Sequence, residues 1–447
     1  MTINIVSRKI PKDLNVAIAR EAIKEVKRDF TLEWLESNIG ADHPIKKLWG
    51  RTDIFATDQL FLLGYSLKKI KTINQKWLSD AIKSIKGDDI GKMRGTILEA
   101  FVASQFHNPP DKVVDLPVSL INPGYDIQVK LSDGSEIYIQ VKNNSALENF
   151  QINENVSYIE DILVSNLRNR ALNVIIYKAD KKDPTDSDWY RLRNQLPAIM
   201  QNVPEGKGIA EEIEGGWYIS VSDISKSISY LHPSKPTYNR LLIIPFSKPE
   251  KDNLLAKISD ACSVLKKKSI TDTEDSINLA MLCVPIEAPF TLCSELAHQY
   301  FGENPEKRAS GILFYKSGPV TDIQNKQSFL AHAFHMVLRN EKKDWLKVHK
   351  ALLPIKLDIG IGRGVFSVDG IDTSDIYNII DAGPRKIKID DQHFYQSGQI
   401  NHLIRKTGTV RFDRHIGVKE RVFYIDSDRL EKEATTDHIV DDRPLLL

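Results

Sequence analysis

The first part of the chain repeats apolar residues at helical spacing among many charged ones. Segments 13–37 and 74–87 carry them three and four positions apart, which predicts amphipathic helices. Gly87 follows the second segment directly, as is typical of a helix end. We therefore predict a helical N-terminal region over residues 1–87. Its simplest interpretation is a structural cap.

The pattern changes over residues 88–185, where segments of helical and strand periodicity alternate. A helix, three strands, a helix and a strand follow one another, and they predict a compact α/β core. In that order, the segments are 89–106, 112–120, the two strands of a hairpin within 124–144, 156–170 and 171–180.

In the C-terminal region, 186–447, strand and helix patterns alternate regularly again from residue 240. Strands and helices of similar length predict a second parallel α/β unit. A long helix is expected over 326–350, where this region could divide, and a glycine-rich tail with short strands follows. Sensing, targeting or partner binding is the role that we expect for the region.

Composition narrows the class of protein only slightly. The 447 residues are 41% hydrophobic and 27% charged, with a net charge of +1, so any basic surface must be local. The three cysteines fit neither a zinc pattern nor a disulfide framework. No apolar run approaches the ~18 residues that span a membrane, and the start is too polar for a signal peptide. We expect a cytoplasmic protein without a membrane partner.

The most informative stretch is GYDIQVKLSDGSEIYIQVKNN, residues 124–144, in which IQVK occurs twice. Side chains alternate between the two faces of a strand, so each copy has one apolar and one polar face. Pairing the apolar faces across a hairpin loop of three or five residues places Val129 opposite Ile139. The same register places Gln128 opposite Gln140 and Asp126 opposite Lys142. It leaves Lys130 near the turn.

This segment resembles the motif of the PD-(D/E)xK nuclease superfamily. That motif has an acidic residue, a short hairpin, and a lysine two positions after a metal-binding residue. Asp126 stands in the first half-motif, and Gln140-Val141-Lys142 in the second. Tyr125 replaces the usual proline. The glutamine resembles the QxK variant of Mrr-type restriction endonucleases and related antiphage defence nucleases. The predicted element order also agrees with the restriction-endonuclease-like α-β-β-β-α-β core, whose first helix often carries a glutamate, here Glu99.

The resemblance implies a Mg²⁺- or Mn²⁺-dependent endonuclease that hydrolyses DNA in restriction or antiphage defence. Asp126 would be the main metal ligand, with Glu99 and the Gln140 carbonyl oxygen beside it. Lys142 would orient the attacking water or stabilise charge on the phosphate. Taken alone, the hairpin fits a surface ion pair equally well, and Glu99 taken alone fits a solvated helix residue.

Other functions stay open at this point. A non-catalytic nucleic-acid-binding or scaffold subunit that retains the fold is the main alternative, because Gln140 removes a carboxylate. RNA as substrate, a homo-oligomer, and activation by a partner ATPase or defence-system subunit are also open. Additional phosphate contacts are expected from basic residues of the core and of the tail, namely Lys130, Arg385, Lys386, Arg411 and Arg414.

Three weaker motifs favour ordinary structure. GDDIGK at 87–92 is one residue short of a P-loop, and GIGRG at 360–364 lacks the strand and helix of a dinucleotide site. His332 and His335 lie three apart on the expected helix at 326–350. Without a third ligand, they are best interpreted as core or surface histidines.

Overall fold

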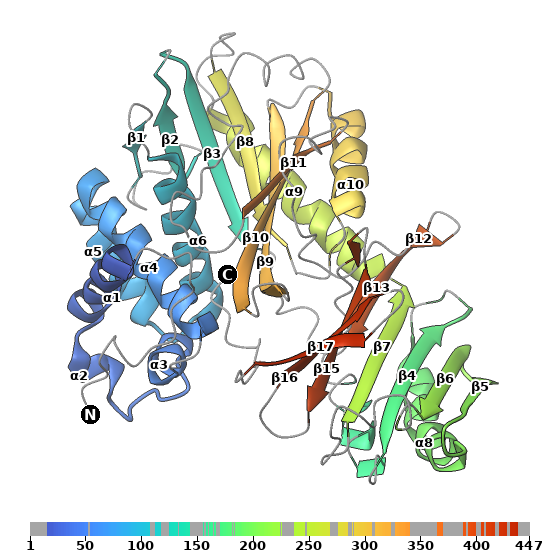
Figure 1. The fold of residues 1–447 in the computed structure, drawn as a ribbon. Coiled ribbons are helices and arrows are strands. Elements are labelled where there is room, and N and C mark those ends of the chain that lie inside the picture. Colours follow the sequence, from blue (N-terminus) through green and yellow to red (C-terminus); the bar gives the residue numbers. More distant parts are fainter. Residues whose placement is uncertain are drawn as a thin grey trace.

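The computed structural model describes most of residues 16–339, with its longest gaps at 118–124, 144–154, 226–236 and 269–275. Beyond residue 339 it describes short segments, namely 364–369, 388–389, 392–398, 404–405, 408–415, 420–426 and 430–436. Helices and strands form a mixed α/β protein, as predicted (Figure 1). No helix in the described part of the chain has the length and apolar character needed to cross a membrane.

The helices predicted for the N-terminal region are present. They are α1 (Val16–Phe30), α2 (Leu32–Leu35), α3 (Pro44–Gly50), α4 (Ile54–Ile73) and α5 (Gln75–Lys86), followed by α6 (Ile90–Phe106). Asp89 caps α6 by accepting a hydrogen bond from the Lys92 amide, so GDDIGK is an ordinary helix start. Helices α1 and α4 approach closely at Gly64, where an added Cβ would lie 1.9 Å from the Ala22 carbonyl oxygen.

Seven of the described strands form the first sheet, in the order β1-β2-β3-β8-β9-β10-β11. Their bounds are β1 (Lys112–Asp115), β2 (Ile127–Lys130), β3 (Glu136–Asn143), β8 (Ser276–Cys283), β9 (Gly311–Asp322), β10 (Gln327–Leu338) and β11 (Gly364–Val368). Strands β3, β8 and β9 are parallel neighbours, and the β1-β2-β3 pairs are antiparallel.

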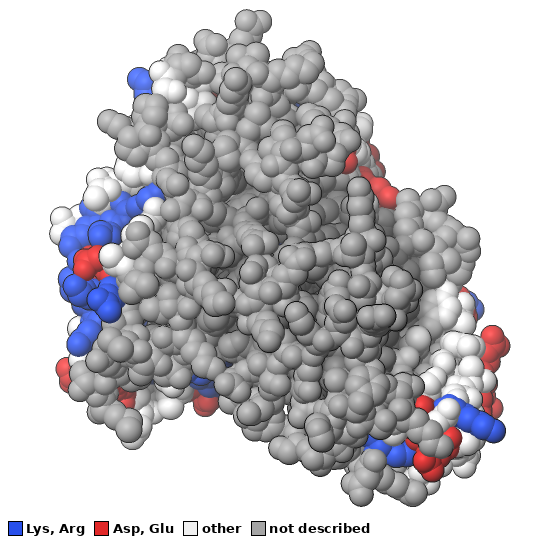
Figure 2. Space-filling model, in the orientation of Figure 1, with Lys and Arg blue, Asp and Glu red and all other residues white. Residues whose placement is uncertain are grey.

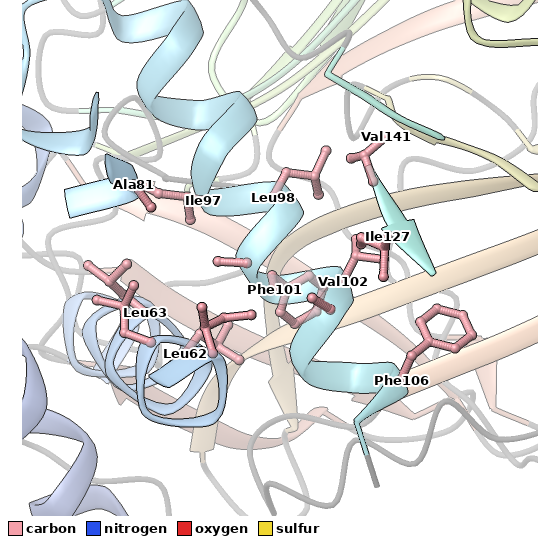
Figure 3. Close-up of a cluster of buried hydrophobic side chains, with 14 of the residues drawn as sticks. Leu62, Leu63, Ala81, Ile97, Leu98, Phe101, Val102, Phe106, Ile127 and Val141 are labelled. Carbon is pink, nitrogen blue, oxygen red and sulfur yellow. The ribbon is translucent and has the colours of Figure 1, made fainter. Parts of the chain in front are cut away.

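Helices cover both faces of this sheet. Alternate residues of β8 sort into two cores, with Leu279 and Met281 beside the N-terminal helices and Ala280 and Leu282 on the opposite side. On that second side lie α9 (Lys248–Lys268) and α10 (Phe290–Glu303) (Figure 1). Helix α6 crosses the first face, and its Leu98 is directed toward Val141 of β3 (Figure 3).

A second sheet runs β17-β16-β15-β7-β4-β6-β5. Its strands are β4 (Ala171–Lys178), β5 (Gly208–Ile213), β6 (Trp217–Asp223), β7 (Thr237–Pro245), β15 (Gly408–His415), β16 (Glu420–Asp426) and β17 (Leu430–Thr436), with α8 (Asp186–Asn202) packed on β5 and β6. Off the main path lie β12 (Lys388–Ile389), β13 (Gln392–Gly398) and β14 (Ile404–Arg405).

The expectation that strand 171–180 completes the first sheet is wrong, because β4 pairs with β6 and β7 in the second sheet. The position beside β3 belongs to β8. Every residue of β8 is buried, which suits a central parallel strand, whereas β4 alternates buried with half-buried residues. After β3, the next strand of the first sheet is β8, which follows α9 and comes after β4, β5, β6 and β7 of the second sheet in the chain.

The helix expected over 326–350 is also wrong in its described part. Residues 327–338 form strand β10, paired antiparallel with β9 along its whole length. Both faces of β10 meet apolar cores, so its sequence lacks the polar alternation that marks a half-buried strand. His332 and His335 are buried on opposite faces, where they bond to Tyr315 and Ser294 respectively.

The regions expected from sequence, 1–87, 88–185 and 186–447, do not coincide with the sheets. The second α/β unit expected from residue 240 is divided between them, because β7 lies in the second sheet while β8 and β9 extend the first. The helix expected over 156–170 is described only in part.

Candidate active site

Asp126 lies immediately before β2, and its backbone amide donates to the Ile139 carbonyl at 2.8 Å. The observed register pairs Ile127 with Ile139 and Val129 with Ile137, which puts Asp126 beside Gln140. The predicted register, with Asp126 opposite Lys142, is therefore wrong by two residues of β3. The assignment of faces is unaffected, because a shift of two residues leaves every side chain on its own side of the sheet.

The turn explains this register. The chain reverses between Leu131 and Ser135, where the Leu131 amide donates to the Ser135 carbonyl at 2.8 Å. Gly134 has a φ of +93°, a conformation that favours glycine, and its amide donates to the Leu131 carbonyl at 3.0 Å. Because this glycine is the last residue of the loop, the pairing of β2 with β3 differs by two residues of β3 from the predicted register.

One oxygen of Asp126 is held by two donors. Gln140 Nε2 lies 2.5 Å and the Val141 amide nitrogen 2.7 Å from Asp126 Oδ2. Gln140 is buried, with 6% of its surface exposed. Among the residues that the structure describes, none donates a hydrogen bond to Asp126 Oδ1. The amide of Gln140 thus fixes the carboxylate, while its own carbonyl oxygen stays available for another partner.

Glu99 on α6 is the second carboxylate of the site. It is half-buried, and within the described part of the chain its carboxylate has no hydrogen-bond or ion-pair partner. Burial and, to a smaller extent, the nearby charge of Asp126 raise the pKa of Glu99 to about 8, against the opposing charge of Lys142. Burial likewise raises the pKa of Asp126 to about 6, against the stabilising Val141 amide, Lys142 and Gln140. The two carboxylates therefore share a site that disfavours two negative charges.

Lys142 lies two residues beyond Gln140, on the same face of β3. Its Nζ lies 2.8 Å from Asp260 Oδ2, and Asp260 projects from α9, which packs on β3. The lysine side chain is 28% exposed and the aspartate 56%. The sequence pattern did not single out Asp260, because no local motif shows that α9 returns to β3 after the second sheet.

A polar array continues from the site along the same face. The Tyr125 hydroxyl donates to Asp115 at 2.9 Å and to Gln128 at 3.2 Å, and Gln128 donates to the Tyr138 hydroxyl at 3.4 Å. Tyr138 in turn donates to Glu136. The two tyrosine rings have their centroids 5.1 Å apart. This array fixes the strand surface beside Gln140.

Of the remaining residues predicted for nucleic-acid contact, those that the structure describes are not gathered at this site. Lys130 pairs with Glu136 at the far end of β2, about 13 Å along the strand from Asp126. Arg411 and Arg414 lie on β15 in the second sheet. Arg385 and Lys386 are outside the described residues.

The residues present fit a hard divalent cation. A cation would find oxygen donors in Asp126 Oδ1, the Glu99 carboxylate and the Gln140 carbonyl, which are the ligand types that Mg²⁺ and Mn²⁺ prefer. A cation there would also stabilise the ionised forms of both acids, whose pKa values burial raises. The described residues include no group of three or more His, Cys, Asp or Glu side chains suited to a metal, so Gln140 or water would complete the ligand set.

Comparison of the chain with protein-family models, curated proteins and solved structures gave no match. The function proposed below therefore depends on the geometry of the chain's own residues.

Proposed function

We propose that this chain is a metal-dependent nuclease that hydrolyses phosphodiester bonds of DNA. One observation carries the proposal: Glu99 and Asp126, both half-buried with raised pKa values, share a site with Lys142 where β2 begins and β3 ends. The two acids disfavour being ionised together, and a bound cation would balance their charge. The lysine beside them would pair with a phosphate.

Each residue has a role in this proposal. Asp126 and Glu99 would hold Mg²⁺ or Mn²⁺, with Gln140 positioning Asp126 and offering its carbonyl oxygen. When bound, the metal supplies Lewis-acid polarisation of the phosphate and a more acidic water. Lys142 would place its ammonium against the phosphate oxygens and stabilise the charge that develops there.

The order of elements supports the same proposal. Helix α6, strands β1, β2 and β3, helix α9 and strand β8 follow the helix, three strands, helix, strand sequence that the resemblance to PD-(D/E)xK nucleases implies. The second sheet would then be an insertion between β3 and α9. The proposed setting in restriction or antiphage defence rests on the resemblance alone. The proposed cytoplasmic location rests on the composition alone.

The experiment incubates the full chain with supercoiled plasmid and Mg²⁺ or Mn²⁺, beside Asp126→Ala and Lys142→Ala. Glu211→Ala and Lys207→Ala are matched controls, because both residues are exposed and lie on or beside β5 of the second sheet. We expect cleavage by the wild type and both controls and its loss in the two site variants. Cleavage that survives both site substitutions would contradict the assignment.

A second candidate is a non-catalytic DNA-binding or scaffold subunit. The hydrogen bond from Gln140 to Asp126 and the ion pair of Lys142 with Asp260 favour it, because both partly satisfy the site without a metal. Binding of DNA without cleavage, across both metals and with a candidate partner ATPase added, would select this function.

A further inference from the structure

A strongly basic segment lies on the N-terminal helices, in a chain whose net charge is only +1. Residues 65–87, which cover the end of α4 and all of α5, contain a single acidic residue, Asp80. The same residues include six lysines, Lys68, Lys69, Lys71, Lys76, Lys83 and Lys86. Lysine and arginine side chains gather on the side of the molecule where α1 and α5 lie (Figures 1 and 2).

Half of these lysines already have partners. Lys69 donates to the Ser104 carbonyl at 2.9 Å, and Lys83 lies 3.5 Å from Asp80. Lys86 is half-buried, with its ammonium over the rings of Phe30 and Trp34. Their positive charges are therefore partly engaged within the protein.

The other three lysines, Lys68, Lys71 and Lys76, are exposed around the corner between α4 and α5. Lys71 and Lys76 form no ion pair with any residue that the structure describes. Lys68 lies near Glu21, whose pKa it helps to lower, but Glu21 is already paired with Lys24 at 2.7 Å. The corner 68–76 therefore presents uncompensated positive charge to solvent.

The fold places this corner near the end of the first sheet at which the candidate active site lies. Asn74, which caps α5, donates from Nδ2 to the Leu116 carbonyl at 3.1 Å. Strand β1 pairs Asp115 with Gln128, so Leu116 continues toward the end of the sheet where Asp126 precedes β2. A polyanion that crosses this end of the sheet would meet both the corner and the site.

We propose that the corner 68–76 binds the phosphate backbone of duplex DNA beside the bond to be cut. This inference rests on the proposed function, since the bound polymer is the substrate. A duplex presents a charge about every 1.7 Å along its axis, which favours clustered lysines. Proteins that bind single strands stack bases on aromatic side chains, and the corner offers none, because Trp77 is buried.

The test measures binding of the full chain to a fluorescent 30-base-pair duplex in EDTA, over a range of KCl concentrations. The variant Lys68→Glu/Lys71→Glu/Lys76→Glu is compared with Lys182→Glu/Arg191→Glu/Lys207→Glu, which makes the same charge change at exposed positions near the second sheet. We expect the corner variant to bind about tenfold or more weakly, with a salt slope smaller by roughly 2–3. The control variant should stay within about threefold of the wild type.

Equal affinity and equal salt slope in the corner variant, at an unchanged melting temperature, would overturn the inference. Preference for a single strand or for duplex RNA would overturn the assignment to duplex DNA. Failure of the proposed function gives a different result. The protein would then bind DNA in a way that depends on the corner, but would not cleave it when Mg²⁺ or Mn²⁺ is added. Asp126→Ala should retain binding in EDTA, which separates the two sites.

Discussion

Gln140 donates from Nε2 to Asp126 Oδ2 across the β2–β3 pair, at 2.5 Å. A glutamate at position 140 would instead add a third carboxylate beside Asp126 and Glu99. The neutral amide holds Asp126 in place without adding charge to a site whose two acids already have raised pKa values.

Replacing Gln140 by glutamate should therefore tighten divalent metal binding, because a further anionic oxygen joins the ligand set. We expect Mn²⁺ affinity, measured by isothermal titration calorimetry, to rise about tenfold or more. Gln128→Glu is the matched control, since Gln128 shares this face of the sheet but lies opposite Tyr138. An affinity that rises equally in both variants would show general charge attraction only.

The metal-free protein should lose stability as pH rises. Glu99 and Asp126 have pKa values of about 8 and about 6 in the folded protein, above the values of about 4 expected when unfolded. Between these limits the folded state binds more protons, so the free energy of unfolding falls as pH rises from about 4 to 8. Urea denaturation in EDTA at pH 5 and pH 8 measures this slope. It should flatten in Glu99→Gln, and an unchanged slope would contradict the raised pKa of Glu99.

The ion pair between Lys142 and Asp260 should compete with phosphate for the lysine. Asp260→Asn should leave the free energy of unfolding within about 1 kcal/mol, because the pair is partly exposed. The same variant should bind duplex DNA more tightly in EDTA than Asp252→Asn, which removes one charge elsewhere on α9. Loss of cleavage to the level of Lys142→Ala would instead mean that Asp260 positions the lysine.

The close approach of α1 and α4 should make Gly64 intolerant of any side chain. An added Cβ would lie 1.9 Å from the Ala22 carbonyl oxygen, so Gly64→Ala requires the helices to separate. We expect a loss of about 2–4 kcal/mol in the free energy of unfolding. Gly95→Ala in α6, where nothing lies within 4 Å, should gain up to about 1 kcal/mol. Equal effects would contradict this packing.

Local patterns in the sequence predicted most helices and the faces of the hairpin. The helices that include Val26, Trp77 and Leu98 form where apolar spacing places them, and their apolar residues enter the first core. The alternation in the two IQVK copies correctly separated Gln140 and Lys142 from Val141. These features depend on neighbours in the sequence, so a single chain reveals them.

Pairing over long distances was not predictable in the same way. Several apolar strands could lie beside β3, and only the packing of α9 shows that the partner is the strand containing Ala280. Two hairpin registers bury the same face, and the conformation of Gly134 decides between them. The residues around Phe334 contain strong helix formers, yet burial on both faces makes them a strand.

The central claim is that Asp126 binds the metal that supports phosphodiester cleavage. The most direct measurement is the rate of plasmid cleavage by Asp126→Cys in Mg²⁺ and in the softer ion Cd²⁺, beside Asp126→Ala. A thiolate ligand prefers the softer ion, so we expect the cysteine variant to be inactive in Mg²⁺ and to recover cleavage in Cd²⁺. The alanine variant should stay inactive in both. Wild-type cleavage by Asp126→Ala in Mg²⁺ would contradict the claim.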